Sequence, residues 1–272
     1  MATGTLPRGL AILQTLVGSA DGLPLTKIAD DVDLPKSAAH RILLTLIDEG
    51  FVQQNEVKGT YALTLRIVSL GLRHLASSTV FELALPILSR LAAESGQLVR
   101  LGLVDGQKLV WVARTQGARA GLRYDPDVDH GSEIPLATSA SGLAWLSGMS
   151  DDDAVSFVAR QEIDLRHEVG HNAPTTLTEV LALIHDTRTR GWARVHDSVE
   201  EGISAMAVPI ADSSNGRALG VVSIAGPSLQ LTDAKMDVLA PGLHAAAVEL
   251  SGLAGSFAND IQLKSHFAGL SA

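Results

Sequence analysis

The sequence contains no cysteine, and this absence excludes several classes of protein at once. Without thiols the chain can have no disulfide scaffold, no thiolate zinc site, no iron–sulfur cluster and no cysteine nucleophile. Any metal would need histidine and carboxylate ligands, and we expect neither a metal nor another cofactor. No apolar run approaches the roughly 18 residues that a membrane-spanning helix requires, so we expect no membrane partner.

Aromatic residues are also scarce, at 4% of the 272 residues, although hydrophobic residues of all kinds make up 46%. This composition is typical of a globular chain, and the length allows one large domain or a small domain joined to a medium one. The amino terminus lacks the basic stretch and apolar core of a secretory signal, so we expect a cytoplasmic protein.

The net charge of −9 at neutral pH argues against a general attraction to nucleic acid, but the charge is unevenly distributed. Residues 1–75 carry seven basic and seven acidic side chains, whereas residues 76–272 carry 14 basic and 23 acidic ones. The first quarter is therefore electrostatically distinct. The acidic remainder is a poor candidate for contact with phosphate.

Three short helices and a hairpin are predicted in the first quarter of the chain. Apolar residues recur at helical spacing over residues 8–16 and again over residues 25–32. Pro35 suits the first position of a third helix, because its missing N–H group has no partner there, and Gly50 ends that helix. Residues 51–64 contain two extended segments joined by a glycine-containing turn. This order is typical of a winged helix-turn-helix domain, whose third helix enters the major groove of DNA.

The outward face of the third predicted helix carries side chains suited to DNA. Lys36 suits a phosphate, and Arg41 can donate two hydrogen bonds to guanine. The small Ser37 and Ala38 allow a close approach to the groove. The predicted DNA-binding residues are Thr26, Lys27, Lys36, Ser37, Ala38, His40, Arg41 and Lys58. The alternative is an ordinary helical subdomain with a solvated polar face, which the zero net charge of this region leaves open.

Several segments resemble the isocitrate lyase regulator (IclR) family of bacterial transcription factors: RGLAILQTL, LPLTKIADDVDLPKSAAHRILLTLIDEGFVQQ and the strand around Tyr61. The run LPKSAAHRIL is the specific part. The resemblance continues through IPLATSASGLAWL, GISAMAVPI and GVVSIAGPSLQLT, so it covers nearly the whole chain. It implies a DNA-binding domain, a connecting helix, and a domain that binds a small effector and helps the protein to oligomerise.

Mostly helical sequence over residues 66–91, with a break near Ser77 and a helix start near Pro86, predicts a linker. The remainder alternates between strands and helices. Strands are predicted at residues 98–104, 108–114, 192–197, 204–210 and 217–225, and helices at residues 139–147, 151–160, 177–191 and 232–253. This order predicts an α+β domain with helices on the faces of a sheet, which the resemblance sharpens to a GAF-like fold.

The predicted domain boundaries follow from these elements. They are residues 1–66 for the winged helix-turn-helix domain, 67–84 for the linker helix, 85–255 for the effector-binding and oligomerisation domain, and 256–272 for a C-terminal tail.

Two strings in the large domain have the residue types of metal sites. Residues 167–171 read HEVGH, the spacing that places two zinc-binding histidines on one helical turn around a glutamate base. Gly170 inside the motif and residues 172–174 (Asn-Ala-Pro) after it disfavour a helix, so a polar loop is favoured over a metalloprotease. Residues 125–130 contain three aspartates and a histidine, but Pro126 and the lack of a later glutamate favour a solvated loop over a calcium site.

Other polar strings have simpler interpretations than catalysis. Residues 151–153 are three aspartates, which fit the first turn of a helix because the helix dipole stabilises them there. Ser139 and Ser141 lack the flanking glycines of a nucleophile elbow. The sequence therefore predicts no catalytic residue.

Small polar residues over residues 138–142 enter a helix and leave backbone N–H groups free, an arrangement that can hold a carboxylate. The resemblance implies that this stretch lines the effector pocket together with later strand residues. The predicted effector-binding residues are Ser139, Ala140, Ser141, Asp197, Ile203, Ala205, Ser223 and Ala225. For Asp197 and Ser223, a hydrogen-bonding role and a merely structural one remain equal alternatives.

The chain departs from the family pattern at several positions of this pocket. Ala137 stands where the family often has histidine, Leu143 where it often has lysine, and Ser204 where it often has arginine. Residues 195–197 are also less acidic than usual. These departures predict a ligand different from the small 2-oxo acids of some relatives.

Together these features predict a ligand-responsive, sequence-specific transcriptional regulator, either a repressor or an activator, that catalyses no reaction. Its expected partners are double-stranded operator DNA, a small-molecule effector such as an organic acid, and further copies of the chain in a homodimer or a tetramer built as a dimer of dimers. The alternative from another class is a small-molecule-binding hydrolase that carries a helical appendage.

Overall fold

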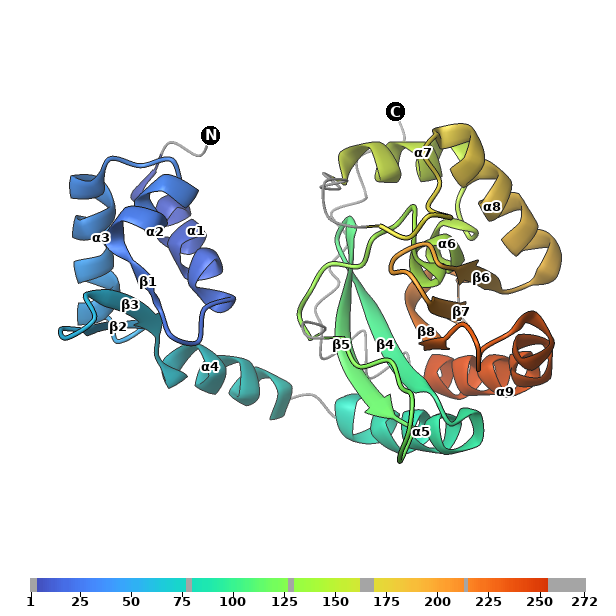
Figure 1. Ribbon diagram of the computed structural model, residues 1–272. Coiled ribbons are helices and arrows are strands. Elements are labelled where there is room, and N and C mark those ends of the chain that lie inside the picture. The colour runs from blue at the N-terminus through green and yellow to red at the C-terminus, as the bar shows by residue number, and fades with distance from the viewer. Residues whose placement is uncertain (1–3, 77–79, 127–129, 162–168, 213–214, 254–272) are drawn as a thin grey trace. The chain divides into compact units, whose positions relative to one another are not determined.

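The computed structural model describes residues 4–76, 80–126, 130–161, 169–212 and 215–253, and these form two compact units (Figure 1). The first unit is Met1–Ser77 and the second is Ser78–Ala272. Each unit has its own hydrophobic core, so each is described by itself. None of the described helices is long and apolar enough to span a bilayer.

The first unit contains three helices, a small antiparallel sheet and a fourth helix. Its elements are α1 (Thr5–Val17), β1 (Leu23–Pro24), α2 (Leu25–Asp31), α3 (Lys36–Asp48), β2 (Val52–Asn55), β3 (Thr60–Leu63) and α4 (Leu65–Ala76). The helices and the hairpin occur where the sequence predicts them. The additional strand β1 pairs with β3, giving the order β1-β3-β2. Two residues are too few to show the alternation by which a strand is recognised in sequence.

A small core holds these elements together. Its buried members come from the three helices α1 to α3 and the hairpin: Ile12, Leu16, Ile28, Ile42, Leu43, Val52 and Tyr61. Pro35, predicted as the first helical residue, is instead the N-cap of α3, and the helix begins one residue later at Lys36. Gly50 follows the helix with φ +72°, the left-handed conformation that commonly terminates helices.

The second unit is built on a five-stranded antiparallel sheet in the order β5-β4-β8-β7-β6. Its strands are β4 (Leu98–Asp105), β5 (Lys108–Gln116), β6 (Ala193–His196), β7 (Ile203–Ala211) and β8 (Ala218–Pro227). Its helices are α5 (Val80–Ser95), α6 (Ala140–Leu146), α7 (Asp151–Arg160), α8 (Leu177–Arg190) and α9 (Asp233–Gly252). The predicted α+β arrangement, with helices on the faces of a sheet, is confirmed.

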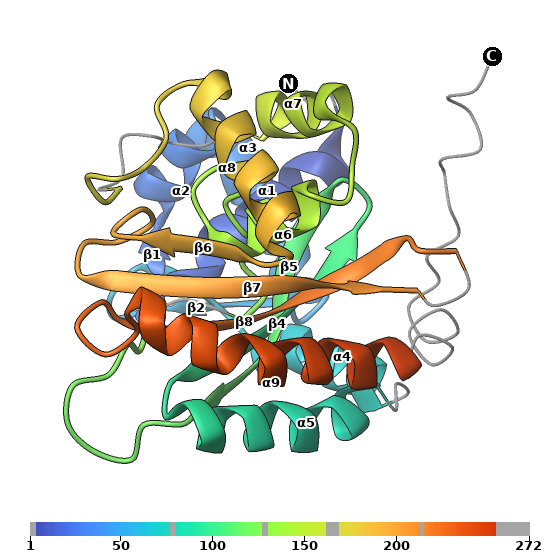
Figure 2. The same cartoon turned by 90° about the vertical axis from the view of Figure 1, so that its right-hand side faces the viewer.

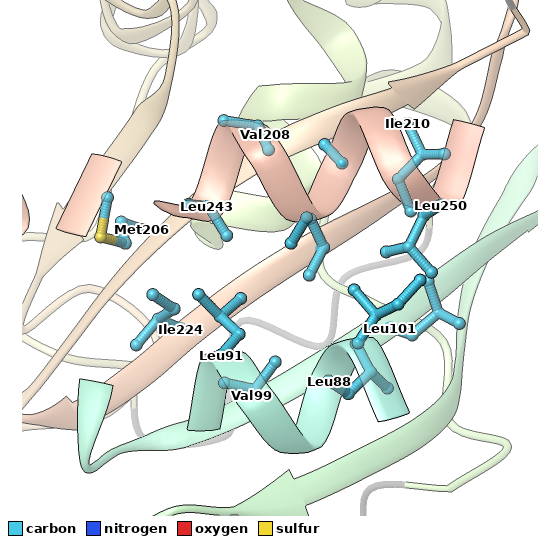
Figure 3. Packing of buried hydrophobic residues seen from close by; sticks show 14 of the residues in the cluster. Leu88, Leu91, Val99, Leu101, Met206, Val208, Ile210, Ile224, Leu243 and Leu250 are labelled. Carbon is cyan, nitrogen blue, oxygen red and sulfur yellow. The ribbon is translucent and has the colours of Figure 1, made fainter. Parts of the chain in front are cut away.

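Helices α5 and α9 lie side by side on one face of this sheet (Figure 2). Their leucines pack against alternate residues of β4, β7 and β8 (Figure 3). The labelled members of this cluster are Leu88, Leu91, Val99, Leu101, Met206, Val208, Ile210, Ile224, Leu243 and Leu250. Pro86 lies inside α5, six residues after its start, so the predicted helix start near this proline is wrong.

Helices α6 and α8 cover the opposite face, and α7 packs against α8 (Figure 2). The rings of Trp145 and Phe157 meet edge to face with centroids 5.1 Å apart, which ties α6 to α7. The three consecutive aspartates lie in the first turn of α7, as predicted. Thr176 and Glu179 form a reciprocal capping box at the start of α8.

The alternation of side chains along β8 determines which residues face α5 and α9 and which face α6. Val222 and Ile224 belong to the cluster under α5 and α9, whereas Val221 belongs to the cluster under α6. Because successive side chains of a strand point to opposite faces, Ser223 and Ala225 lie on the α6 side.

Candidate functional site

The first candidate site is the outward face of α3. Ala39, Ile42 and Leu43 are buried in the core of the first unit, and Lys36 and Arg41 are exposed on the other side of the helix. Ser37 is also exposed, while Ala38 and His40 are half-buried. Hydrophobic spacing alone fixes this division, since every third or fourth residue of α3 packs inward. The structure thus brings the predicted residues of α3 to one side of one helix.

Two predicted phosphate contacts lie outside α3 and have acidic neighbours. The Nζ atom of Lys27 in α2 donates to Asp31 at 2.6 Å, and this hydrogen bond raises the pKa of Lys27. Lys58, in the turn between β2 and β3, lies 3.7 Å from Asp21. These exposed pairs are weak in water, so both lysines can exchange their partner for a phosphate. Thr26 is exposed beside Lys27 in α2.

Sequence reasoning overlooked two further residues of this face. Leu44 is 44% exposed, and Thr45 is exposed next to it. Both follow Arg41 by about one helical turn, so they continue the same side of α3. A leucine and a threonine methyl can contact the methyl group of thymine. The spacing from Arg41 was the available signal.

The second candidate site is a cavity of about 60 Å³ between the sheet and α6 in the second unit. Its wall is formed by the start of α6, the residues before it, all five strands of the sheet, and the segments after β5 and β6. The lining residues are Arg100, Trp111, Tyr124, Ile134, Pro135, Ser139, Ala140, Ser141, Val195, Val199, Ile203, Ala205 and Ala225. Most of this wall is apolar, which is typical of a small-molecule site.

The structure brings most of the predicted effector-binding residues to this cavity. Six of the eight line it directly: Ser139, Ala140, Ser141, Ile203, Ala205 and Ala225. Ser223 is fully buried on the same face of β8 but does not line the cavity. Asp197 lies outside the lining, where its carboxylate accepts hydrogen bonds from the Gly202 N–H and the Ser228 hydroxyl. These bonds close the turn between β6 and β7.

Seven lining residues were not predicted as effector-binding, and three of them, Arg100, Trp111 and Tyr124, bring a charged group and aromatic rings to the cavity. The Arg100 guanidinium carbon lies 4.1 Å from the ring centroid of Trp111 and 5.7 Å from that of Tyr124. Arginine over an aromatic face is held by cation–π attraction, which orients its planar fork. The available signal was weak, because a single arginine in an otherwise apolar strand is more often an edge residue than a pocket residue.

The start of α6 is less open than predicted. The Ser139 hydroxyl accepts from the Gly142 N–H at 2.9 Å and donates to the Pro135 carbonyl. One of the N–H groups that the sequence offers to a ligand is therefore used by the helix cap.

Three side chains, two from β5 and one from just before α9, hold the segment that carries Tyr124. Gln116 donates to the Tyr124 carbonyl at 2.8 Å, and Arg114 donates to the Pro126 carbonyl at 3.2 Å. Gln230, just before α9, donates to the Leu122 carbonyl at 3.0 Å. The position of the Tyr124 ring at the cavity thus depends on contacts with β5 and with the approach to α9.

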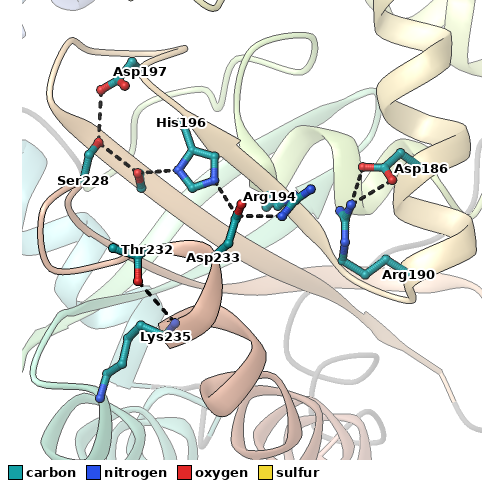
Figure 4. Close-up of polar contacts among 10 residues, drawn as sticks. Asp186, Arg190, Arg194, His196, Asp197, Ser228, Thr232, Asp233 and Lys235 are labelled. Carbon is teal, nitrogen blue, oxygen red and sulfur yellow. Dashed lines mark hydrogen bonds and ion pairs between the residues drawn. The ribbon is translucent and has the colours of Figure 1, made fainter.

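A chain of polar contacts links the turn after β6 to the first residue of α9 (Figure 4). Asp197 accepts from Ser228 at 3.0 Å, and Ser228 accepts from Ser204 at 2.9 Å. The Ser204 oxygen is 2.7 Å from Nδ1 of His196, whose Nε2 is 2.8 Å from Asp233. Because the Asp233 carboxylate can only accept, Nε2 of His196 donates the hydrogen bond at that end of the chain.

The Asp233 end of this chain predicts a pH-dependent contribution to stability. His196 and Arg194 hold the pKa of the Asp233 carboxyl below its ordinary value. A lowered folded-state pKa stabilises the protein above the unfolded-state value near 3.8, and that stabilisation is lost as the pH falls through the folded-state pKa. Because Asp233 is 55% exposed, Asp233→Asn should cost only about 0.5 kcal/mol near neutral pH.

Denaturant unfolding between pH 2.5 and about pH 7 measures this effect, since the two proteins should converge at the acid end. Asp237→Asn is the matched control, because Asp237 is exposed one turn further along α9. A constant difference between wild type and Asp233→Asn down to the lowest pH would contradict the prediction.

Residues 167–171 and 125–130 have the residue types of metal sites, but those of them that the structure describes make other contacts. His167 and Glu168 lie outside the described residues, while Val169 and Gly170 are not helical. Gly170 packs so closely on Asp197 that an added Cβ would lie 2.0 Å from its carbonyl oxygen. His171 pairs with Glu201 at 2.8 Å, which raises the pKa of His171. The polar loop is thus the interpretation that these contacts favour.

The first aspartate of residues 125–130 is likewise engaged in ion pairs. Asp125 forms an ion pair with Arg123 at 2.9 Å and lies 3.6 Å from Arg114, whereas Asp127 and Asp129 fall outside the described residues. Within the described ranges, no group of three or more histidine and carboxylate side chains is arranged to hold a metal ion.

Comparisons with known proteins follow the division into two units. Residues 5–56 match the model of the IclR helix-turn-helix domain, and residues 72–252 match the model of the C-terminal part of bacterial IclR transcriptional regulators. The chain is 27% identical to the transcriptional repressor IclR of Escherichia coli over 255 residues, which cover 92% of this chain and 90% of the repressor.

Solved structures show the same fold. An IclR family transcriptional regulator from Brucella abortus is 25% identical with a TM-score of 0.73, covering 93% of this chain and 92% of that one. An IclR homologue from Microbacterium hydrocarbonoxydans, in complex with 4-hydroxybenzoate, is 20% identical with a TM-score of 0.72, covering 92% and 98%. Nothing in these matches supports the alternative of a hydrolase.

Proposed function

Because this chain belongs to the IclR family of bacterial transcriptional regulators, we propose that it binds operator DNA through α3 and changes its DNA affinity when a small organic acid occupies the cavity under α6. One observation carries the proposal. A single chain joins a unit whose α3 presents exposed Lys36 and Arg41 to a second unit that contains a cavity with an oriented arginine. The 4-hydroxybenzoate complex of the Microbacterium relative supports an acid as the effector.

The residues of the first unit have distinct roles in this proposal. Arg41 reads a guanine, while Ser37, Ala38 and His40 fit the groove around it. Lys36 at the start of α3 and Thr26 and Lys27 in α2 contact phosphates, and Lys58 in the hairpin turn contacts the flanking backbone. Phosphate contacts position the domain, and the base contact of Arg41 supplies specificity.

The proposed regulator acts in the cytoplasm and catalyses no reaction. A ligand changes DNA affinity only if it binds two conformations of the protein unequally, so its effect is a shift between them. Selection of genomic fragments by the full chain tests DNA recognition, and competition with organic acids then tests the response. Failure to prefer any fragment over bulk DNA, with and without acids, would overturn the proposal.

We also propose that the protein acts as a homodimer or a dimer of dimers, in which apolar helix faces of the first unit pair with a second copy. Leu65, Val68 and Leu72 follow one side of α4 and are exposed within the chain. Leu6 and Leu10 are likewise exposed on α1. Apolar stripes of this length on a soluble protein are typical of interaction surfaces.

Leu72→Glu should therefore weaken self-association. Leu72 is 59% exposed, and burial of one leucine contributes about 1.5–3 kcal/mol, which counts twice in a two-fold interface. The dimer dissociation constant should rise about a hundredfold or more, as measured by analytical ultracentrifugation. Leu229→Glu is the control, since Leu229 is 86% exposed outside any helix of the described structure. Equal masses for both variants and wild type would contradict the proposed interface.

A further inference from the structure

Leu44 is a large apolar side chain on the outward face of α3. It is exposed, although Leu43 before it is fully buried and Leu46 after it is half-buried. Because an α-helix repeats about every 3.6 residues, Leu44 shares one line of the helix surface with Ser37 and Arg41, which are also exposed. Leu44 thus lies among the side chains that are proposed to enter the major groove.

The core of the first unit does not account for this leucine. Among the described residues, Leu44 belongs neither to the buried cluster of this unit nor to the partly buried hydrophobic residues that pack against it. A single exposed leucine is ordinary on a protein surface, so its role must be inferred from its neighbours. Its exposed neighbours along the same line are Arg41 before it and Asp48 after it. Arginine suits guanine and aspartate suits the amino group of cytosine, so Leu44 lies between two side chains that can bond to base edges.

The major groove of DNA offers one apolar group to such a leucine. Thymine presents a methyl group at C5, whereas the other bases are distinguished there by hydrogen-bond donors and acceptors. Leu44 follows Arg41 by about 4.5 Å along the helix axis, and base pairs are stacked about 3.4 Å apart. With α3 in the groove, Leu44 therefore reaches a base pair about one or two steps from the guanine that Arg41 contacts.

We propose that Leu44 determines specificity for a thymine, whose C5 methyl group it buries, about one or two base pairs from the guanine contacted by Arg41. The inference rests on the proposed binding of operator DNA through α3 and adds a second base-specific contact to that of Arg41. Burial of one methyl group corresponds to a factor of about four in affinity, so two half-sites contribute a factor of about fifteen.

The test replaces thymine by deoxyuridine, which lacks only the C5 methyl group and keeps the same base pairing. The full chain first selects its operator from random duplexes. Each thymine of the half-site is then replaced in both half-sites at once, and fluorescence anisotropy gives the Kd of each duplex. At one thymine position, replacement should weaken binding by wild type about fifteenfold.

Leu44→Ala connects this loss to the protein. Alanine has a high helix propensity and Leu44 packs outside the core, so the variant should fold as wild type does. It should bind the thymine and deoxyuridine duplexes with the same Kd at that position, which shows that the leucine and the methyl group act on each other.

Thr45→Ser is the matched control, because Thr45 is exposed next to Leu44 and also carries a methyl group. The change deletes that methyl group and keeps the hydroxyl, which donates to the Arg41 carbonyl at 3.2 Å. Thr45→Ser should therefore retain the whole preference for thymine over deoxyuridine.

The outcomes separate this inference from the proposed function. If no replacement of a thymine weakens binding by wild type, or if Leu44→Ala keeps the preference, Leu44 does not contact a thymine methyl group, while operator binding through α3 stands. Loss of the preference in Thr45→Ser alone would assign the contact to Thr45 and overturn the proposal. If the full chain prefers no duplex over bulk DNA, the inference and the proposed function both fail.

Discussion

Replacement of Arg41 by alanine is expected to abolish the preference of this protein for its operator over bulk DNA. Arg41 is exposed on the outward face of α3, away from the buried Ile42 and Leu43. A bidentate arginine–guanine contact contributes about 1–3 kcal/mol of discrimination, and two copies bound to two half-sites contribute about twice that. Specific affinity should therefore fall about thirtyfold or more, whereas non-specific affinity should change little.

Fluorescence anisotropy with operator and scrambled duplexes at several salt concentrations measures both quantities. Arg119→Ala is the matched control, since it removes the same charge from an exposed position of the second unit. Lys36→Ala gives a second contrast, because loss of a phosphate contact weakens both duplexes equally and reduces the salt dependence. If Arg41→Ala kept the wild-type ratio of affinities for the operator and scrambled duplexes, α3 would be excluded as the helix that recognises the operator sequence.

The first unit could be predicted in most respects because its signals are local. Helical spacing placed α1, α2 and α3, and the turn containing Gly59 placed the hairpin. The same spacing divided α3 into a buried and an outward face. The strand β1 could not be predicted, since its two residues are specified by pairing with β3 rather than by their own pattern.

The cavity of the second unit was predicted only in part, and the reason is physical. Ser139 and Ala205 were identified from a resemblance that covers the sequence around them, and both line the cavity. Arg100 and Trp111 belong to this site because β4 and β5 pair with a register shift between Leu101 and Gly102. A register depends on contacts between distant segments, so no local sequence pattern reveals which arginine faces a pocket.

The structural role of Asp197 could not be predicted from the local sequence either. Its residue type suits ligand binding, but its φ of +47° and its bonds to Gly202 and Ser228 assign it to a turn. Aspartate is one of the few residues that tolerate the left-handed conformation, because its side chain can bond to the nearby backbone. Sequence alone could not distinguish this use of a carboxylate from recognition of a ligand.

The second large effect is expected for Gly142→Ala at the roof of the cavity. In an ordinary helix this change is stabilising, because alanine has the higher helix propensity. Here a Cβ at Gly142 would lie 2.3 Å from the carbonyl oxygen of Leu136 and 2.4 Å from its Cα. Both atoms belong to the backbone, so α6 must move away from the segment that precedes it. We expect a cost of about 3 kcal/mol and a Tm lower by about 6–12 °C.

Gly148→Ala, just beyond the same helix, is the control for replacement of a glycine by alanine without a close backbone contact. Its added Cβ would meet the Trp145 carbonyl at an ordinary 3.6 Å, so its Tm should stay near that of wild type. Displacement of α6 also moves Ser139 and Ser141, which line the cavity, so Gly142→Ala should lose the effector response at temperatures where it is folded. Its DNA affinity should persist there, since the first unit has a core of its own. A Gly142→Ala protein that melts at or above the wild-type temperature would mean that α6 does not rest on Leu136, and that the cavity has a different roof.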